Sequence, residues 1–331
     1  MPSIDMPLEQ LLSYEGRNPR PADFDRFWDE SVREMHAIDP QIELRPATFQ
    51  VDCADCFDLF WTGMGGARVH AKYLRPKNDT SSTRTGEQKT HPAVLQFHGY
   101  GGSSGDWNDK LGYVAAGFSV AALDVRGQAG ESEDAVATLG PTSSGQIIRG
   151  LDDALASRPE KLFFRNAFLD CAQMARIVMN FPEVDASRVG AVGGSQGGGL
   201  TLACAALEPS IKKIAPTFPF LCDYQRVWEM DLAVAAYAEL KTYFRHFDPR
   251  HQRESEIWTA LGYIDNQHLA RRIQAKTLMC VGLSDTVCPP STQFAAYNKI
   301  AGEKNLLVYP DYGHEGLPGS NDEVFQFLSD L

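Results

Sequence analysis

The spacing of apolar side chains predicts a helix near the start of the chain, followed by a β-hairpin. Apolar residues recur at helical spacing within residues 21–38, at Phe24, Phe27, Trp28, Val32 and Met35. We therefore expect residues 1–45 to form a helical N-terminal extension. Residues 46–77 alternate between apolar and polar on both sides of a glycine-rich turn at 63–66, as a hairpin does. The polar stretch 77–91 then predicts an exposed loop.

Short apolar runs separated by helical patterns dominate the remaining chain. The strand-like runs are residues 93–97, 119–125, 188–193, 212–218, 277–282 and 305–310. Between them, residues 168–181 place Phe168, Cys171, Met174, Ala175 and Val178 on one face of a helix. Nearly continuous apolar strands that alternate with helices indicate an α/β fold, with a mostly parallel central sheet flanked by helices.

Residues 219–272 interrupt this rhythm. They are helical in pattern and rich in aromatic side chains. We interpret them as an insertion that forms a lid or a subunit contact, because α/β folds of this length often form one unit. The prediction is therefore a single domain over residues 1–331.

Composition excludes several classes of function. The formal net charge is −12 and the sequence pI is about 5.1. Such a surface repels phosphate backbones and acidic lipid, so we expect neither a nucleic-acid nor a membrane partner. The N-terminal residues lack the basic start and long apolar segment of a signal peptide, and no run approaches the ~20 apolar residues of a membrane span. These patterns predict a cytoplasmic protein.

The seven cysteines fit this location. An odd number without a secretion signal indicates free thiols. Cys53 and Cys56 form a C-x-x-C in a strand-like stretch, but no second ligand pair completes a zinc site. We interpret them as incidental thiols and expect no metal or cofactor.

One serine has the surroundings of a nucleophile. Ser195 follows the strand-like run 188–193 directly, precedes an amphipathic segment, and has Gly193 and Gly197 two positions away on each side. A tight strand-to-helix turn exposes such a hydroxyl, and small neighbours let the substrate approach. The start of the following helix also presents free backbone N–H groups, which can stabilise an oxyanion.

A second G-x-S-x-G pattern surrounds Ser103, but its strand ends several residues earlier, near Phe97. The intervening sequence, residues 98–102, reads HGYGG. A segment of this type after an early strand supplies a second oxyanion N–H group. We therefore expect the N–H groups of Tyr100 and Gln196 to form the oxyanion hole, and Ser103 to be a loop residue.

A serine nucleophile needs a base and a carboxylate, in the chain order serine, carboxylate, histidine for this type of turn. Asp285 follows the strand-like run 277–282, and His314 follows the run 305–310. Both lie at strand carboxyl ends, where catalytic groups gather in open α/β sheets. We predict Ser195, Asp285 and His314 as the catalytic residues.

Other candidates have simpler explanations. His98 would break the chain order as a base and is expected to shape the HGYGG loop. The three histidines of the insertion are expected to be solvated, three earlier histidines carry no motif, and two acids near His314 are expected to have no catalytic role. These residues are His246, His251 and His268; His36, His70 and His91; and Asp311 and Glu315.

Several motifs together resemble one known family. The combination of Arg126-Gly127-Gln128, Gly193-Gly194-Ser195-Gln196-Gly197 and His314-Glu315 is similar to the acetyl xylan esterase and cephalosporin C deacetylase family, carbohydrate esterase family seven. Supporting stretches lie at 98–102, 104–107, 124–128, 218–223 and 282–292. The resemblance covers nearly the whole chain, whereas the C-x-x-C and the loop 77–91 are not part of the family pattern.

The resemblance implies an α/β-hydrolase fold and an enzyme that removes acetyl groups from short xylo-oligosaccharides and cephalosporin C. It implies a homo-hexamer with internal active sites, and in many members peracid formation. It carries the catalytic roles onto Ser195, Asp285 and His314, the oxyanion hole onto Tyr100 and Gln196, and substrate contact onto Tyr100, Pro219 and Phe220. It gives Arg126 and Gln128 a structural role.

Three alternatives remain open from the sequence. A peptidase of the prolyl-oligopeptidase type shares the serine motif, but 331 residues leave no room for its propeller domain. A carboxylesterase for longer acyl chains would use the insertion as its lid. A non-catalytic binding protein of the same fold would be expected to lack one of the catalytic residues or to have a blocked oxyanion hole.

Overall fold

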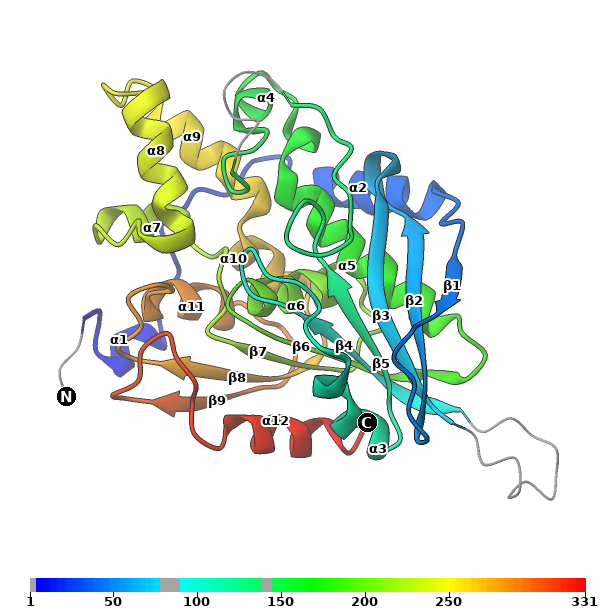
Figure 1. The fold of residues 1–331 in the computed structure, drawn as a ribbon. Coiled ribbons are helices and arrows are strands. Elements are labelled where there is room, and N and C mark those ends of the chain that lie inside the picture. Colours follow the sequence, from blue (N-terminus) through cyan, green and yellow to red (C-terminus); the bar gives the residue numbers. More distant parts are fainter. Residues whose placement is uncertain (1–3, 78–89, 139–144) are drawn as a thin grey trace.

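A nine-stranded sheet organises the computed structural model, which describes residues 4–77, 90–138 and 145–331 (Figure 1). The strand order is β1-β2-β3-β5-β4-β6-β7-β8-β9. The strands are β1 (Glu43–Pro46), β2 (Ala54–Thr62), β3 (Arg68–Pro76), β4 (His91–Phe97), β5 (Ser119–Asp124), β6 (Val184–Gly194), β7 (Lys213–Thr217), β8 (Lys276–Gly282) and β9 (Lys304–Tyr309). The predicted loop 77–91 lies almost entirely outside the described residues.

The sheet is parallel from β5 to β9, and only its β1–β3 edge pairs antiparallel. This confirms the predicted α/β fold with a mostly parallel sheet. The chain passes from β4 to its neighbour β5 and then crosses to β6 on the other side of β4. The carboxyl ends of β4 and β6 therefore meet at the point where the strand order reverses, which is the usual ligand position in open α/β sheets.

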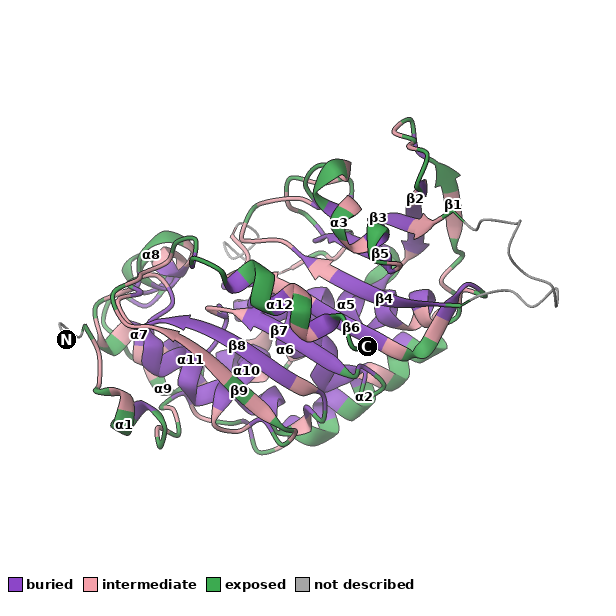
Figure 2. Cartoon of the chain, turned by 90° about the horizontal axis from the view of Figure 1, so that it is seen from below, coloured by how far each residue is buried: buried purple, intermediate pink, exposed green. Residues whose placement is uncertain are grey.

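Helices cover both faces of this sheet. Figure 1 places α3 and α12 on one face, and α2, α5, α6 and α10 on the other. The helices are α1 (Leu8–Leu11), α2 (Phe24–Ala37), α3 (Leu111–Ala115), α4 (Leu151–Leu155), α5 (Phe163–Met179), α6 (Gln196–Leu207), α7 (Tyr224–Glu229), α8 (Ala238–Phe247), α9 (Glu254–Leu261), α10 (Asn266–Leu269), α11 (Pro290–Tyr297) and α12 (Ser320–Leu328). The central strands are buried along most of their length, whereas α12 turns one face to solvent (Figure 2). Among the described residues, none of the helices combines the length and the apolar character that a bilayer crossing requires.

The N-terminal extension is helical only in part. Helix α2 forms where predicted and buries Phe24, Phe27, Trp28 and Met35. Residues 43–46, however, form strand β1 and pair antiparallel with β2, so the prediction of a helical extension up to residue 45 was wrong at its end. Four residues are too few for an alternating pattern to be recognised, and the pairing with β2 makes this segment a strand.

The predicted hairpin and the predicted buried helix are both present. Strands β2 and β3 pair around the turn at 63–66, where Gly65 and Gly66 have φ values of 67° and 79° that side-chain-bearing residues rarely adopt. Helix α5 begins at Phe163, five residues before the predicted start, because the residues of its first turn are also buried.

The insertion 219–272 is helical, as predicted, and contains α7, α8, α9 and α10. It packs against the main body, with α7 contacting α11 and α9 contacting α4. His251 and His246 are exposed, as expected. His268 is instead buried, and burial lowers its pKa to about 3, so the expectation of a solvated His268 was wrong. Helix α10 packs against α6 and α11, and the His268 ring lies against the Phe24 ring, so contacts that sequence patterns do not show enclose it.

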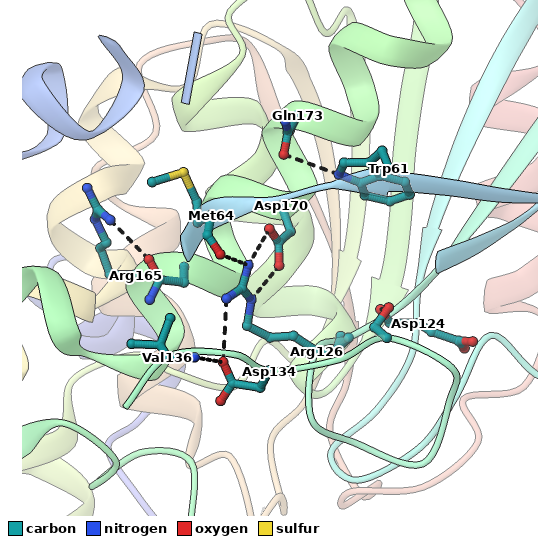
Figure 3. A network of polar contacts seen from close by, with 12 residues as sticks. Trp61, Met64, Asp124, Arg126, Asp134, Val136, Arg165, Asp170 and Gln173 are labelled. Carbon is teal, nitrogen blue, oxygen red and sulfur yellow. Dashed lines mark hydrogen bonds and ion pairs between the residues drawn. The ribbon is translucent and has the colours of Figure 1, made fainter. Parts of the chain in front are cut away.

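A buried ion pair joins the end of β5 to helix α5 and the hairpin turn (Figure 3). The Arg126 guanidinium donates to both carboxylate oxygens of Asp170 at 2.6 and 2.7 Å, and to the Met64 carbonyl at 3.1 Å. Both side chains are almost fully enclosed. A Cβ atom at Gly63 would lie 2.6 Å from the Asp170 carboxylate, so glycine is required there for the turn to approach the pair.

Substituting Arg126→Ala should lower the free energy of unfolding by about 3–5 kcal/mol, because it leaves the Asp170 carboxylate buried without its charge partner. Urea denaturation followed by fluorescence and circular dichroism measures this. Arg45→Ala, which removes an exposed arginine paired with Glu43, is the matched control and should leave the midpoint unchanged. Equal midpoints for the two variants would show that the Arg126 pair does not stabilise the fold.

Candidate active site

Ser195 lies in a strained turn between β6 and α6. Its backbone angles are φ 58° and ψ −121°, a combination that residues other than glycine rarely adopt. Three backbone hydrogen bonds hold it: the Ser195 N–H donates to the Thr217 carbonyl at 3.0 Å, and the Ser195 carbonyl accepts from Gly199 and Phe220. Backbone strain of this kind persists only where surrounding structure enforces it, and it is typical of functional sites.

The glycines around Ser195 allow three chain segments to approach closely. A Cβ atom on Gly197 would lie 2.0 Å from the carbonyl oxygen of Phe97, at the end of β4. A Cβ atom on Gly193 would lie 2.7 Å from the same oxygen, and one on Gly199 would lie 2.4 Å from the Phe220 carbonyl. The run of glycines is therefore required by contact between α6, β4 and the segment after β7, not by flexibility.

The structure brings the three predicted catalytic residues into one hydrogen-bonded line. His314 Nε2 lies 3.0 Å from Ser195 Oγ, and His314 Nδ1 lies 2.8 Å from Asp285 Oδ2. The three come from the loops after β6, β8 and β9, at one edge of the sheet. A neutral imidazole that donates from Nδ1 to the carboxylate leaves Nε2 free to accept the serine proton.

Buried donors fix the Asp285 carboxylate. Asp285 is fully buried, and its Oδ1 accepts from the N–H groups of Val287 and Cys288, each at 2.8 Å. Gln293 donates to Oδ2 at 3.4 Å. These contacts aim Oδ2 at His314, while the Phe218 ring packs against the imidazole at 4.5 Å between centroids.

The HGYGG segment lies beside the start of α6. His98 donates from Nδ1 to the Gly99 carbonyl at 2.7 Å and accepts at Nε2 from the Val125 N–H at 3.0 Å. This requires a neutral ring, and burial lowers the pKa of His98 accordingly. Both ring nitrogens are engaged within the loop, which agrees with the expectation that His98 shapes it.

Paired side-chain amides connect this segment to α6. Gln128 donates to Gln196 Oε1 at 2.7 Å, and Gln196 donates in return to Gln128 Oε1 at 3.0 Å. The same Gln128 oxygen accepts from the Gly101 N–H at 2.9 Å. Gln128 therefore holds the loop of Tyr100 against the first residue of α6. The RGQ motif marked Gln128, but the sequence did not reveal its contact with Gln196.

The residues expected to contact substrate differ in exposure. Pro219 and Phe220 are buried, and Tyr100 is half-buried with its ring 5.8 Å from that of Phe220. The Tyr100 hydroxyl donates to the carboxylate of Glu239 on α8, which also accepts from the N–H groups of Gln146 and Ile148. Glu239 was not predicted as a site residue, because no pattern connects position 239 to position 100.

The rejected candidates lie away from this line of contacts. Ser103 is in a loop, where its Oγ accepts from the Gly105 N–H at 3.4 Å. Asp311 and Glu315 are exposed, and Glu315 accepts from the Gly313 N–H within its own loop. Among the earlier histidines, His70 is buried between two carboxylates on the β2–β3 hairpin side.

Comparisons with known proteins cover all or most of the chain. The family model Acetyl xylan esterase (AXE1) matches residues 1–331. Acetyl esterase Axe7A of Xylanibacter ruminicola is 25% identical over 315 residues, covering 92% of this chain and 65% of that protein, so the chain spans less than two thirds of this relative. Acetyl xylan esterase 1 from a Thermoanaerobacterium species is 56% identical with a TM-score of 0.93, covering 98% of this chain and 99% of that one. An acetyl xylan esterase from a Paenibacillus species is 36% identical with a TM-score of 0.90, at the same coverage.

Substituting Gly197→Ala should reduce kcat/KM for an acetate ester by about 10² or more, because the added methyl group must push α6 away from β4 and displace Ser195. Steady-state assays of ester hydrolysis measure the loss of activity, and urea denaturation measures the loss of stability. Gly112→Ala, on α3 with open space around its Cβ position, is the control and should behave as the native protein. Native activity in Gly197→Ala would contradict the requirement for close contact.

Proposed function

Because the chain belongs to the acetyl xylan esterase family, we propose that it is a serine esterase that removes acetyl groups from small acetylated substrates, such as xylo-oligosaccharides and cephalosporin C. The observation that carries this proposal is the hydrogen-bonded line from Ser195 through His314 to Asp285, at 3.0 and 2.8 Å. Nucleophile, base and orienting carboxylate are within reach of one another, as acyl transfer requires.

The proposed reaction has two steps. Ser195 Oγ attacks the ester carbonyl carbon while its proton passes to His314 Nε2, and Asp285 stabilises the imidazolium. The carbon–oxygen bond to the alcohol breaks, and the leaving oxygen takes the proton from Nε2. Water then attacks the acetyl-enzyme by the same route and releases acetate and free Ser195. No cofactor or metal enters either step.

We assign the oxyanion hole to the N–H groups of Tyr100 and Gln196. Gln196 is the first residue of α6, so its N–H has no partner within the helix. Tyr100 lies in the loop that Gln128 and Gln196 hold through their amides. We also assign substrate contact to Tyr100, Pro219 and Phe220, with the buried Phe220 ring beneath the half-buried Tyr100.

A general carboxylesterase for longer chains is the second candidate, because the helical insertion reaches the Tyr100 loop through Glu239. Hydrolysis of nitrophenyl esters from acetate to octanoate separates the two. We expect kcat/KM to fall steeply beyond acetate, and Ser195→Ala to lose on the order of 10⁶ in kcat. A maximum at longer chains would assign the enzyme to the carboxylesterases, whereas activity retained in Ser195→Ala would exclude Ser195 as the nucleophile.

We further propose that the chain works as a cytoplasmic homo-hexamer whose internal sites admit oligosaccharides. Val234 and Phe247, which are 45% and 39% exposed, lie in the insertion that we interpret as a lid or a subunit contact. Light scattering should give a mass about six times that of the chain, and acetate release should be much faster from soluble xylo-oligosaccharides than from insoluble xylan. A monomer with equal rates on both would refute this assembly.

A further inference from the structure

A cluster of acidic side chains surrounds one buried histidine on β3, which β5 and β4 separate from the β6 strand that leads to Ser195. His70 lies on β3, directly opposite Asp124 of β5 and diagonally opposite Asp58 of β2. Its Nδ1 lies 2.6 Å from Asp124 Oδ2, and its Nε2 lies 3.1 Å from Asp58 Oδ1. Glu131, in the loop after β5, also comes close: ligand atoms of Asp58, His70 and Glu131 all lie within 4.8 Å of one another.

This arrangement requires a cation. Asp124 is buried, and only the imidazole N–H at Nδ1 can make its 2.6 Å contact favourable. In a neutral ring, Nε2 then has a lone pair that faces the carboxylate oxygen of Asp58. Two lone pairs at 3.1 Å repel unless a proton or a metal ion lies between them.

We propose that Asp58, His70 and Glu131 bind one divalent transition-metal ion of the zinc type. Imidazole and carboxylate ligands suit zinc, with bonds of about 2.0–2.1 Å to each. Ligand atoms 3.1 Å apart, as in His70 and Asp58, then subtend about 100° at the ion, close to the tetrahedral angle. Water would complete the coordination, as it does in open zinc sites.

The surrounding residues match the support that metal sites normally have. A histidine ligand usually donates its second ring N–H to a carboxylate, as His70 does to Asp124. The same Asp124 oxygen accepts from the Glu131 N–H at 3.0 Å, so one buried carboxylate orients two ligands. His70 is 1% exposed whereas Asp58 is 29% exposed and Glu131 is exposed, which leaves the ion a path from solvent.

Two arginines lie near the proposed ligands, and Arg45 interacts electrostatically with Asp58 and Glu131. Arg45 and Arg68 lie over the Phe60 ring, which packs on His70 at 4.7 Å. Both guanidinium groups donate to the carboxylate of Glu43 instead of to the proposed ligands. The three carboxylates of Asp58, Asp124 and Glu131 therefore provide negative charge that a divalent ion would neutralise.

Zinc titration of the chelator-treated, full-length protein by calorimetry tests this site. We expect one ion per chain with micromolar or tighter affinity, weakened at least about tenfold in Glu131→Gln and in Asp58→Asn. Glu131 is exposed, so Glu131→Gln should fold normally. Glu133→Gln removes an equal charge two residues away and should bind zinc as the native protein does.

The experiment must also distinguish this site from a second group of residues that could bind a metal ion. Asp285, Cys288 and His314 also have ligand atoms within 4.8 Å of one another, at the site already described. Cys288→Ser should keep the zinc, and bound cobalt should give visible ligand-field bands without thiolate charge transfer. The proposal is overturned if native protein binds no zinc, if Glu131→Gln and Glu133→Gln bind it equally, or if only Cys288→Ser loses it.

Discussion

The site depends on one steric constraint, the contact between the start of α6 and the end of β4. Only a residue without a side chain can occupy position 197, where a Cβ atom would lie 2.0 Å from the Phe97 carbonyl. This contact, together with the backbone bonds to Thr217 and Phe220, holds Ser195 at a φ of 58°. The strained turn places the Ser195 hydroxyl at the carboxyl ends of the parallel strands. Asp285 and His314 follow β8 and β9 at the same ends, so His314 lies within hydrogen-bond distance of the hydroxyl and Asp285 within hydrogen-bond distance of His314.

The polar network behind this turn determines where the proposed oxyanion donors lie. Gln128 and Gln196 exchange amide hydrogen bonds, and Gln128 also holds the N–H of Gly101. Two residues before Gln128, the buried Arg126 binds Asp170 of α5 and the turn of the hairpin. The short RGQ segment therefore connects the core to the loop of Tyr100. Because an unpaired buried charge is costly, the pair constrains the position of this segment strongly.

Asp124 links the proposed metal site to the same loop. One of its oxygens accepts from the Ser104 N–H, just after HGYGG, and the other faces His70 and the Glu131 N–H. A cation at His70, whether a proton or a metal ion, therefore neutralises the carboxylate that anchors this loop. The buried Asp124 side chain therefore connects the antiparallel strands of the sheet to the HGYGG loop at the carboxyl ends of the parallel strands.

The sequence pattern was sufficient to predict the features that depend on neighbouring residues. Apolar spacing identified α2, the hairpin and the parallel strands, and the glycines around Ser195 marked a strand-to-helix turn, because periodicity and small-residue requirements are properties of neighbouring positions. Strand ends also placed Asp285 and His314 near the serine. Tertiary packing alone decided that residues 43–46 pair as a strand, that His268 is buried, that Glu239 meets Tyr100, and that His70 faces Asp58 and Glu131. Those contacts join positions that no local pattern connects, and their free energy comes from burial and charge pairing that exist only once the sheet has formed.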